Sequence, residues 1–104
     1  LRGAALGILV CGDLERALPE APEYWVIDAS IAAQNMVLAA QALGIGSVWL
    51  GCWPCEDRVQ EVKELMALPE NIVPHSILAL GYAKEPDNEE RDLYESDRVH
   101  FDEW

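Results

Sequence analysis

Basic residues are scarce in this sequence of 104 residues: seven Lys and Arg stand against nineteen Asp and Glu, for a net charge of -12. A surface of that sign repels phosphate, which argues against nucleic acid and anionic membranes as partners. Long hydrophobic runs are also missing, since a membrane-spanning helix needs about 20 apolar residues. The first residues lack the basic stretch and cleavage pattern of a signal peptide. We therefore expect a soluble, cytoplasmic protein.

Cysteine is rare, and its count of three is odd, which fits a reducing compartment better than a disulfide framework. Apolar residues make up 51% and charged residues 25%, the balance of a globular protein rather than a disordered one. The length suffices for one compact domain. Because the chain begins at Leu1 and enters an apolar segment almost at once, we expect that an upstream part is missing.

Short apolar segments alternate with helical patterns along the chain. The sequence predicts strands over residues 4–11, 46–51 and 75–82, with helices over 24–43 and 56–66 between them. Strands separated by helices imply crossover connections, and hence a largely three-layer α/β or an α+β arrangement. The first strand is apolar throughout, so we expect it to be buried on both faces.

The two predicted helices differ in character. Residues 24–43 are apolar nearly all round, which predicts burial against a sheet on one side and against a second layer or a partner subunit on the other. Residues 56–66 are amphipathic, with Val59, Val62 and Met66 on one face. The final segment, residues 83–104, is acidic and without a period, but Val99, Phe101 and Trp104 near its end predict docking as an edge strand or against another subunit.

Several short patterns could carry chemistry. Cys52 and Cys55 form a CxxC pair ahead of a helix, the position in which a helix N-terminus activates a thiol for dithiol exchange. The acids Glu56 and Asp57 follow at once and oppose thiolate formation. A zinc site from this pair and His75 lacks a clear fourth ligand, and Cys11 and His100 are the only candidates. No metal site is predicted.

Nucleophilic and nucleotide chemistry find little support. Ser30, Ser47, Ser76 and Ser96 lack an elbow motif, and no glycine-rich segment matches a phosphate-binding loop. The sequence therefore predicts no catalytic side chain.

A resemblance covers most of the chain. The segments DASIAAQNMVLAAQALGIGSVWLGCWP, LMALPENIVPHSILALGY and ERDLYESDRVHFDEW resemble, in order and spacing, the carboxyl-terminal part of the FMN-dependent nitroreductase family. The resemblance implies an α+β fold, a nitroreductase-like three-layer α/β/α sandwich that here lacks the amino-terminal segment, with residues 1–104 as one partial domain and 83–104 as an extended tail. It also implies a homodimer with the flavin at the subunit interface and the helix over residues 24–43 in that interface.

The same resemblance implies a function and a site. The family uses NADH or NADPH to reduce bound FMN, which then reduces a nitroaromatic, quinone or related small-molecule acceptor in a ping-pong reaction. Leu50, Gly51 and Cys52 match the place where main-chain N–H groups approach the isoalloxazine ring, and Arg91 matches the basic residue that pairs with the FMN phosphate. The amino-terminal half of the family's domain has no counterpart in the sequence. Alternative functions are a thioredoxin-like dithiol oxidoreductase that uses Cys52 and Cys55, and a non-catalytic remnant or interaction domain.

Overall fold

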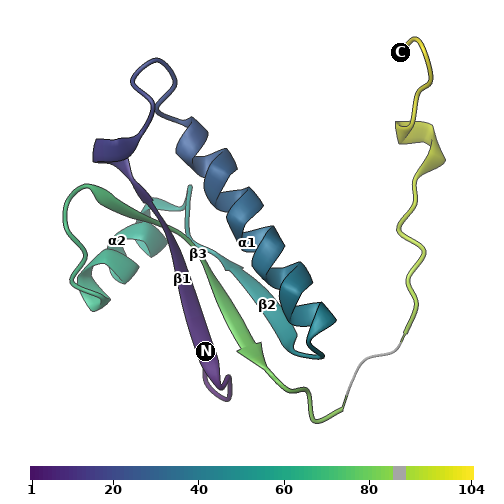
Figure 1. Ribbon diagram of the computed structural model, residues 1–104, viewed down its shortest axis with the longest axis horizontal. Helices are drawn as coiled ribbons and strands as arrows, with labels where there is room; N and C mark the ends of the chain where they lie inside the picture. Colours follow the sequence, from purple (N-terminus) through teal and green to yellow (C-terminus); the bar gives the residue numbers. More distant parts are fainter. Residues whose placement is uncertain (86–88) are drawn as a thin grey trace.

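A computed structural model describes residues 1–85 and 89–104 of the chain, in which three strands and two α-helices follow one another in alternation (Figure 1). Two short 3-10 turns complete the order. The α-helices and strands are, in chain order, β1 (Leu6–Asp13), α1 (Tyr24–Ala42), β2 (Gly46–Gly51), α2 (Glu56–Leu65) and β3 (Ile72–Gly81). The fold is α+β, as expected.

The three strands form one antiparallel sheet in the order β1-β3-β2, so β3 is central and the other two strands each have an open edge. The register of β1 against β3 shifts between Val10, which pairs with Ser76, and Cys11, which pairs with Pro74. His75 is therefore an extra residue in β3, a β-bulge. A bulge turns successive side chains away from strict alternation, which directs both His75 and Ser76 toward α1.

Helix α1 lies across one face of the sheet and forms the core with it. Ala33 and Leu78 are fully buried there, together with Val10 and Ala29. The alanines let the helix backbone approach the strands closely, as their small size predicts. Trp25 and Met36 pack around this cluster.

Helix α2 supplies the third layer. Leu50 and Ile77 are paired neighbours whose side chains point away from the α1 face, because the next residues along, Trp49 and Leu78, pair on that face. Leu50 and Ile77 line a hollow with Val62 of α2, so the two helices cover opposite faces. Of the residues predicted on the apolar face of this helix, Val62 faces the sheet, whereas Met66 lies beyond the end of α2 and is exposed.

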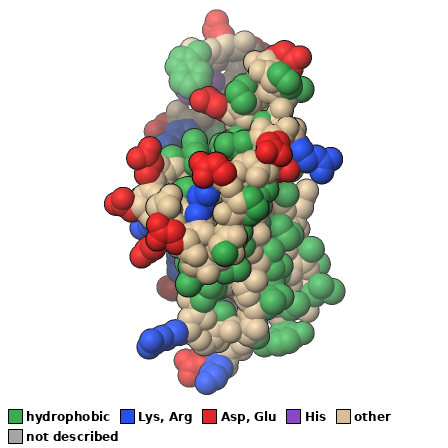
Figure 2. Space-filling model, turned by 90° about the vertical axis from the view of Figure 1, so that its left-hand side faces the viewer, with side chains coloured by type: hydrophobic (Ala, Val, Ile, Leu, Met, Phe, Trp, Pro, Cys, Tyr) green, Lys and Arg blue, Asp and Glu red, His purple; other side chains and the backbone are tan. Residues whose placement is uncertain are grey.

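Among the described residues, the outer face of α1 and the sheet face that also carries α2 both expose apolar side chains. The outer face of α1 exposes Ile27, Ile31 and Leu38, and the sheet face below α2 exposes Val48. Figure 2 shows hydrophobic side chains at the surface over the lower half of the molecule, with acidic side chains mostly above them. The prediction that the first strand is buried on both faces is wrong for this chain, because β1 is an edge strand and only one of its faces packs against α1.

The third strand begins earlier than predicted, at Ile72 rather than at residue 75, and it includes Pro74. Proline normally marks the end of a central strand because it lacks an N–H donor. Here the pairing with β2 ends at Ser76, so at Pro74 the strand has a ladder partner on one side only. Because β2 no longer pairs with β3 at this point, the missing N–H of Pro74 costs no hydrogen bond to β2.

The predicted tail, 83–104, includes residues 86–88, which lie outside the described residues. From Glu89 to the end the chain has one 3-10 turn, Ser96–Arg98, and forms no edge strand, so that option is wrong within this chain. The tail extends away from the sheet (Figure 1), and Phe101 and Trp104 are exposed, Trp104 at 99%. None of the described helices is long and apolar enough to cross a membrane.

Gly12 is required by the packing of Trp25. A Cβ at Gly12 would overlap the indole ring, whereas one at Gly7 in the same strand would meet Leu1 at an ordinary 3.4 Å. We expect G12A to lower the free energy of unfolding by about 1–3 kcal/mol through overpacking, measured by urea denaturation. G7A is the matched control, and equal losses in the two variants would contradict this account.

Candidate functional site

The end of β2 borders a cavity of about 450 Å³. Leu50, Gly51 and Cys52, the three residues that the sequence singles out for flavin contact, all line it. Its remaining walls come from β2, β3 and α2: Trp49, Ile77, Arg58, Glu61 and Val62. The structure therefore brings the predicted main-chain segment to a cavity that is large enough for part of a flat ring.

The amides at this point are not equivalent. The Cys52 N–H donates to the carbonyl of His75 at 3.0 Å, and the Trp53 N–H donates to the same carbonyl at 3.2 Å. Since the amides of a strand alternate in direction, the Gly51 N–H points to the open edge of β2. The Gly51 carbonyl points the same way, and it accepts from Nη1 of Arg58 at 3.3 Å. The Cys52 amide is thus directed into the sheet, whereas the Gly51 amide is directed outward.

Gly51 also has room beside it. A Cβ built on Gly51 would meet nothing within 4 Å, so the main chain at this residue is open to a flat molecule. An outward N–H donor without a side chain in front of it fits an isoalloxazine edge. The residues present are therefore compatible with the ring of FMN.

His75 is buried at 7% exposure and links α1 to β3. Ser30 Oγ donates its one proton to the carbonyl of Val26 at 2.7 Å, so its 3.0 Å contact with His75 Nε2 requires the histidine to donate there. Nδ1 then accepts from Ser76 Oγ at 3.0 Å. Burial lowers the pKa of His75, against a smaller opposing effect of the Val26 carbonyl, and this shift favours the neutral ring with its proton on Nε2. Ser30 is thus not activated as a nucleophile, since His75 donates to it rather than accepting its proton.

This serine and histidine cluster is what the sequence analysis missed. Ser30 and His75 are 45 residues apart and belong to no motif. The bulge that aims His75 at α1 has no signature in the sequence. Proline at residue 74 was the nearest local signal of an irregular strand.

The three cysteines are free. Cys55 caps the start of α2 and is exposed, whereas Cys52 is buried at 4% exposure ahead of the helix. Burial raises the pKa of the Cys52 thiol, and the nearby Arg58 charge only partly opposes this effect. This arrangement does not favour the thioredoxin-like alternative. Within residues 1–85 and 89–104, no group of three or more His, Cys, Asp or Glu side chains is placed to hold a metal ion.

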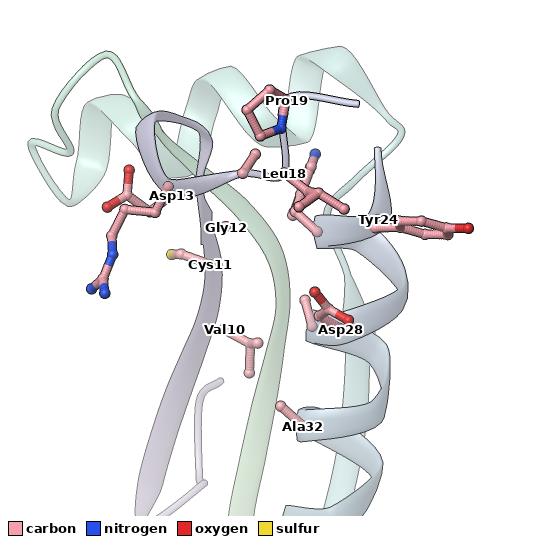
Figure 3. A pocket seen from close by; sticks show the side chains of 13 residues that line it. Val10, Cys11, Gly12, Asp13, Leu18, Pro19, Tyr24, Asp28 and Ala32 are labelled. Atoms are coloured by element: carbon pink, nitrogen blue, oxygen red, sulfur yellow. The ribbon is translucent and has the colours of Figure 1, made fainter. Parts of the chain in front are cut away.

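A larger cavity lies elsewhere, between β1, the connection after it and the start of α1. It measures about 800 Å³, and Figure 3 shows Asp13, Tyr24 and Asp28 around it. No sequence motif pointed to this cavity. Trp25, which lines it, makes edge contacts with the rings of Trp53 and His75 at centroid distances of 5.9 and 6.0 Å. Trp25 therefore contacts both this cavity and the turn after β2.

Arg91 is not brought to the cavity at the end of β2. It lies in the exposed tail, in which Arg98 forms an ion pair with Glu95.

Comparison with known proteins gives consistent matches. A model of the nitroreductase family matches residues 1–82. A Methanothermobacter thermautotrophicus protein provisionally named NADH dehydrogenase/NAD(P)H nitroreductase is 43% identical over the whole chain, which spans 53% of that relative. The oxygen-insensitive NADPH nitroreductase of Salmonella typhimurium is 34% identical over 79 residues, covering 75% of this chain and 32% of the relative.

A solved structure shares the fold. The FMN-dependent nitroreductase of Clostridium difficile matches with a TM-score of 0.84 at 27% identity, covering 99% of this chain and 60% of that one. This match confirms the expected nitroreductase-like fold. The chain spans about half the length of the first relatives that it matches.

The neutral state of His75 predicts a pH dependence of stability. Because the pKa of His75 is lowered in the folded chain from 6.5, the unfolded chain takes up the proton first as the pH falls below 6.5. The free energy of unfolding then decreases with falling pH, with a slope of at most about 1.4 kcal/mol per pH unit for one proton. We expect H75Q to lose this component in denaturation curves measured between neutral and acidic pH.

The exposed His100 in the tail provides the control. H100Q removes a histidine from an exposed position and should leave the free energy of unfolding at neutral pH unchanged. If H75Q and wild type have parallel profiles, the neutral assignment of His75 is wrong.

Proposed function

The chain belongs to the nitroreductase family, and from this membership we propose that it is part of an FMN-dependent NAD(P)H oxidoreductase that reduces nitroaromatic, quinone or related acceptors. The observation that carries the proposal is the family match over residues 1–82 together with the outward amide of Gly51 at an open cavity. The names of the relatives support FMN and a nicotinamide donor.

Bound FMN would supply the redox chemistry, a ping-pong transfer of hydride from the nicotinamide to the flavin and then of two electrons to the acceptor. This chain's residues would bind and orient the ring. Gly51 would donate its N–H to a ring edge, and Leu50 and Cys52 would border the ring. No acid or base from this chain is needed for hydride transfer, which agrees with the hydrogen bonds that already engage Ser30 and His75.

The turn that presents Gly51 is held from behind. The carbonyl of His75 accepts from the amides of Cys52 and Trp53, so the two peptides that follow the Gly51 amide are held in one direction. Such fixed donors cost no reorganisation when charge develops on a bound group. This rigidity supports a role in positioning rather than in proton transfer.

We also propose a homodimer in which the exposed tail reaches the second copy. The outer face of α1, with Ile27, Ile31 and Leu38, is an apolar surface of the kind that partner subunits cover. In such a dimer the tail would bring Arg91 toward the flavin phosphate of the other subunit, where a planar guanidinium can bind two oxygens.

Residues 1–104 would then form one partial domain, with 83–104 as its tail and with the amino-terminal half of the domain supplied by further chain. The free cysteines support a reducing, cytoplasmic setting.

The test of the proposed function is flavin binding by the complete gene product. We expect a yellow protein with flavin absorbance, and we expect G51V to weaken FMN binding by about tenfold or more because its side chain occupies the space that the ring needs. Thermal stability should be unchanged, since a Cβ there meets nothing within 4 Å. V48A in the same strand, outside the cavity, is the matched control. A colourless wild-type protein that takes up no added FMN would rule the proposal out.

The homodimer is tested separately on α1. Ile31 is 56% exposed, so I31E should leave the fold intact but place a charge in the proposed interface. We expect its dimer dissociation constant to rise by about 100-fold or more, measured by sedimentation, because burying an unpaired carboxylate costs several kcal/mol. L65E at an 83% exposed position of α2 is the control. A wild-type monomer, or an I31E protein that dimerises normally, would refute the interface.

A further inference from the structure

Arg58 is a residue that no sequence motif singled out, and it lies at the proposed flavin site. It is in the first turns of α2, and its Nη1 donates to the Gly51 carbonyl at 3.3 Å. It also lines the cavity that Leu50, Gly51 and Cys52 border. Two separate observations, the hydrogen bond to Gly51 and the position in the cavity wall, therefore place the Arg58 side chain at this site.

The bond from Arg58 fixes the peptide next to the outward amide. The Gly51 carbonyl and the Gly51 N–H point to the same side of the strand, so a donor on the carbonyl also limits rotation of the residue that carries the N–H. The His75 carbonyl restrains the following two amides. Arg58 thus completes the restraint of this turn from the α2 side.

We propose that Arg58 is a positioning residue of the Leu50–Cys52 site, and that its guanidinium places on the cavity a positive charge that stabilises negative charge developing there. This inference rests on the proposed function for its flavin part. A reduced flavin ring carries more negative charge than the oxidised ring, so a nearby cation favours the reduced state. The role differs from the phosphate pairing proposed for Arg91, because Arg58 is on the wall beside the ring-binding segment.

The charge of Arg58 already acts on a neighbour in the absence of flavin. It lowers the pKa of the Cys52 thiol, against the larger raising effect of burial. Titratable groups near this thiol include Cys11 on β1, His75 on β3 and Cys55, whose N–H donates to the Cys52 carbonyl at 3.0 Å. Glu61 on α2 lines the same cavity as Arg58 and carries the opposite charge, so its removal should act in the opposite direction to removal of Arg58.

Helix α2 also offers a matched control cation. The Lys63 ammonium donates to the carbonyl of Glu70 at 3.0 Å and does not line this cavity. K63Q removes the same unit charge from the same helix as R58Q. A general effect of net charge would be equal in the two variants, whereas a site-specific effect would appear in R58Q alone.

The experiment compares wild type, R58Q, R58K, E61Q and K63Q in the complete gene product. Without flavin, the pKa of Cys52 is measured by NMR titration of its Cβ. With FMN bound, the midpoint potential is measured by anaerobic titration. We expect R58Q to raise the thiol pKa and to lower the potential, with reduced FMN losing about threefold to tenfold in affinity relative to oxidised FMN.

The companion variants sharpen the result. E61Q should shift both readouts the other way, R58K should retain most of the wild-type values, and K63Q should match wild type. The R58Q effect should shrink at high salt, since Arg58 is exposed and its field is screened. Equal shifts in R58Q and K63Q, or no shift in R58Q, would overturn the proposal. If wild type binds no FMN, the proposed function fails, and the flavin-free titration of Cys52 still decides whether Arg58 supplies charge to the cavity.

Discussion

The arrangement at the end of β2 depends on one carbonyl group, that of His75. It accepts hydrogen bonds from two successive amides, Cys52 and Trp53, and so sets the direction in which the chain leaves the sheet. The carbonyl faces β2 because Cys52 and His75 continue the register in which Gly51 pairs with Ser76. The ring of His75 is fixed in turn by Ser30 on α1 and Ser76 on β3. One carbonyl of the central strand therefore holds the turn that follows the Gly51 amide.

Much of the fold follows from the sequence pattern. The β2 strand is predicted at its observed bounds, and α1 is predicted within one residue, because the run without Gly or Pro ends at a glycine with positive φ, Gly44. The start of β3 was not predictable in this way. Local rules place a break at Pro74, and only the sheet context, in which β2 no longer pairs there, allows a strand to continue through it.

The candidate site likewise has a part that the sequence indicates and a part that only the structure shows. The segment Leu50–Cys52 is contiguous, so a resemblance of motifs is enough to point to it, and the structure gives it a cavity. Arg58 and His75 reach this segment from other elements, through helix packing and through strand pairing. Neither contact has a fixed spacing in the sequence. Residues that a fold brings together by such long-range packing carry no local pattern from which they could be read.

The unpaired outer edges of β1 and β2 have a practical consequence for handling the isolated chain. Exposed edge strands are templates for pairing with other molecules, and such pairing leads to aggregation. A net charge of -12 keeps copies apart by mutual repulsion at low ionic strength. Added salt weakens that repulsion while leaving the edges open, so dilute buffers of low ionic strength are the conditions in which this chain is best kept in solution.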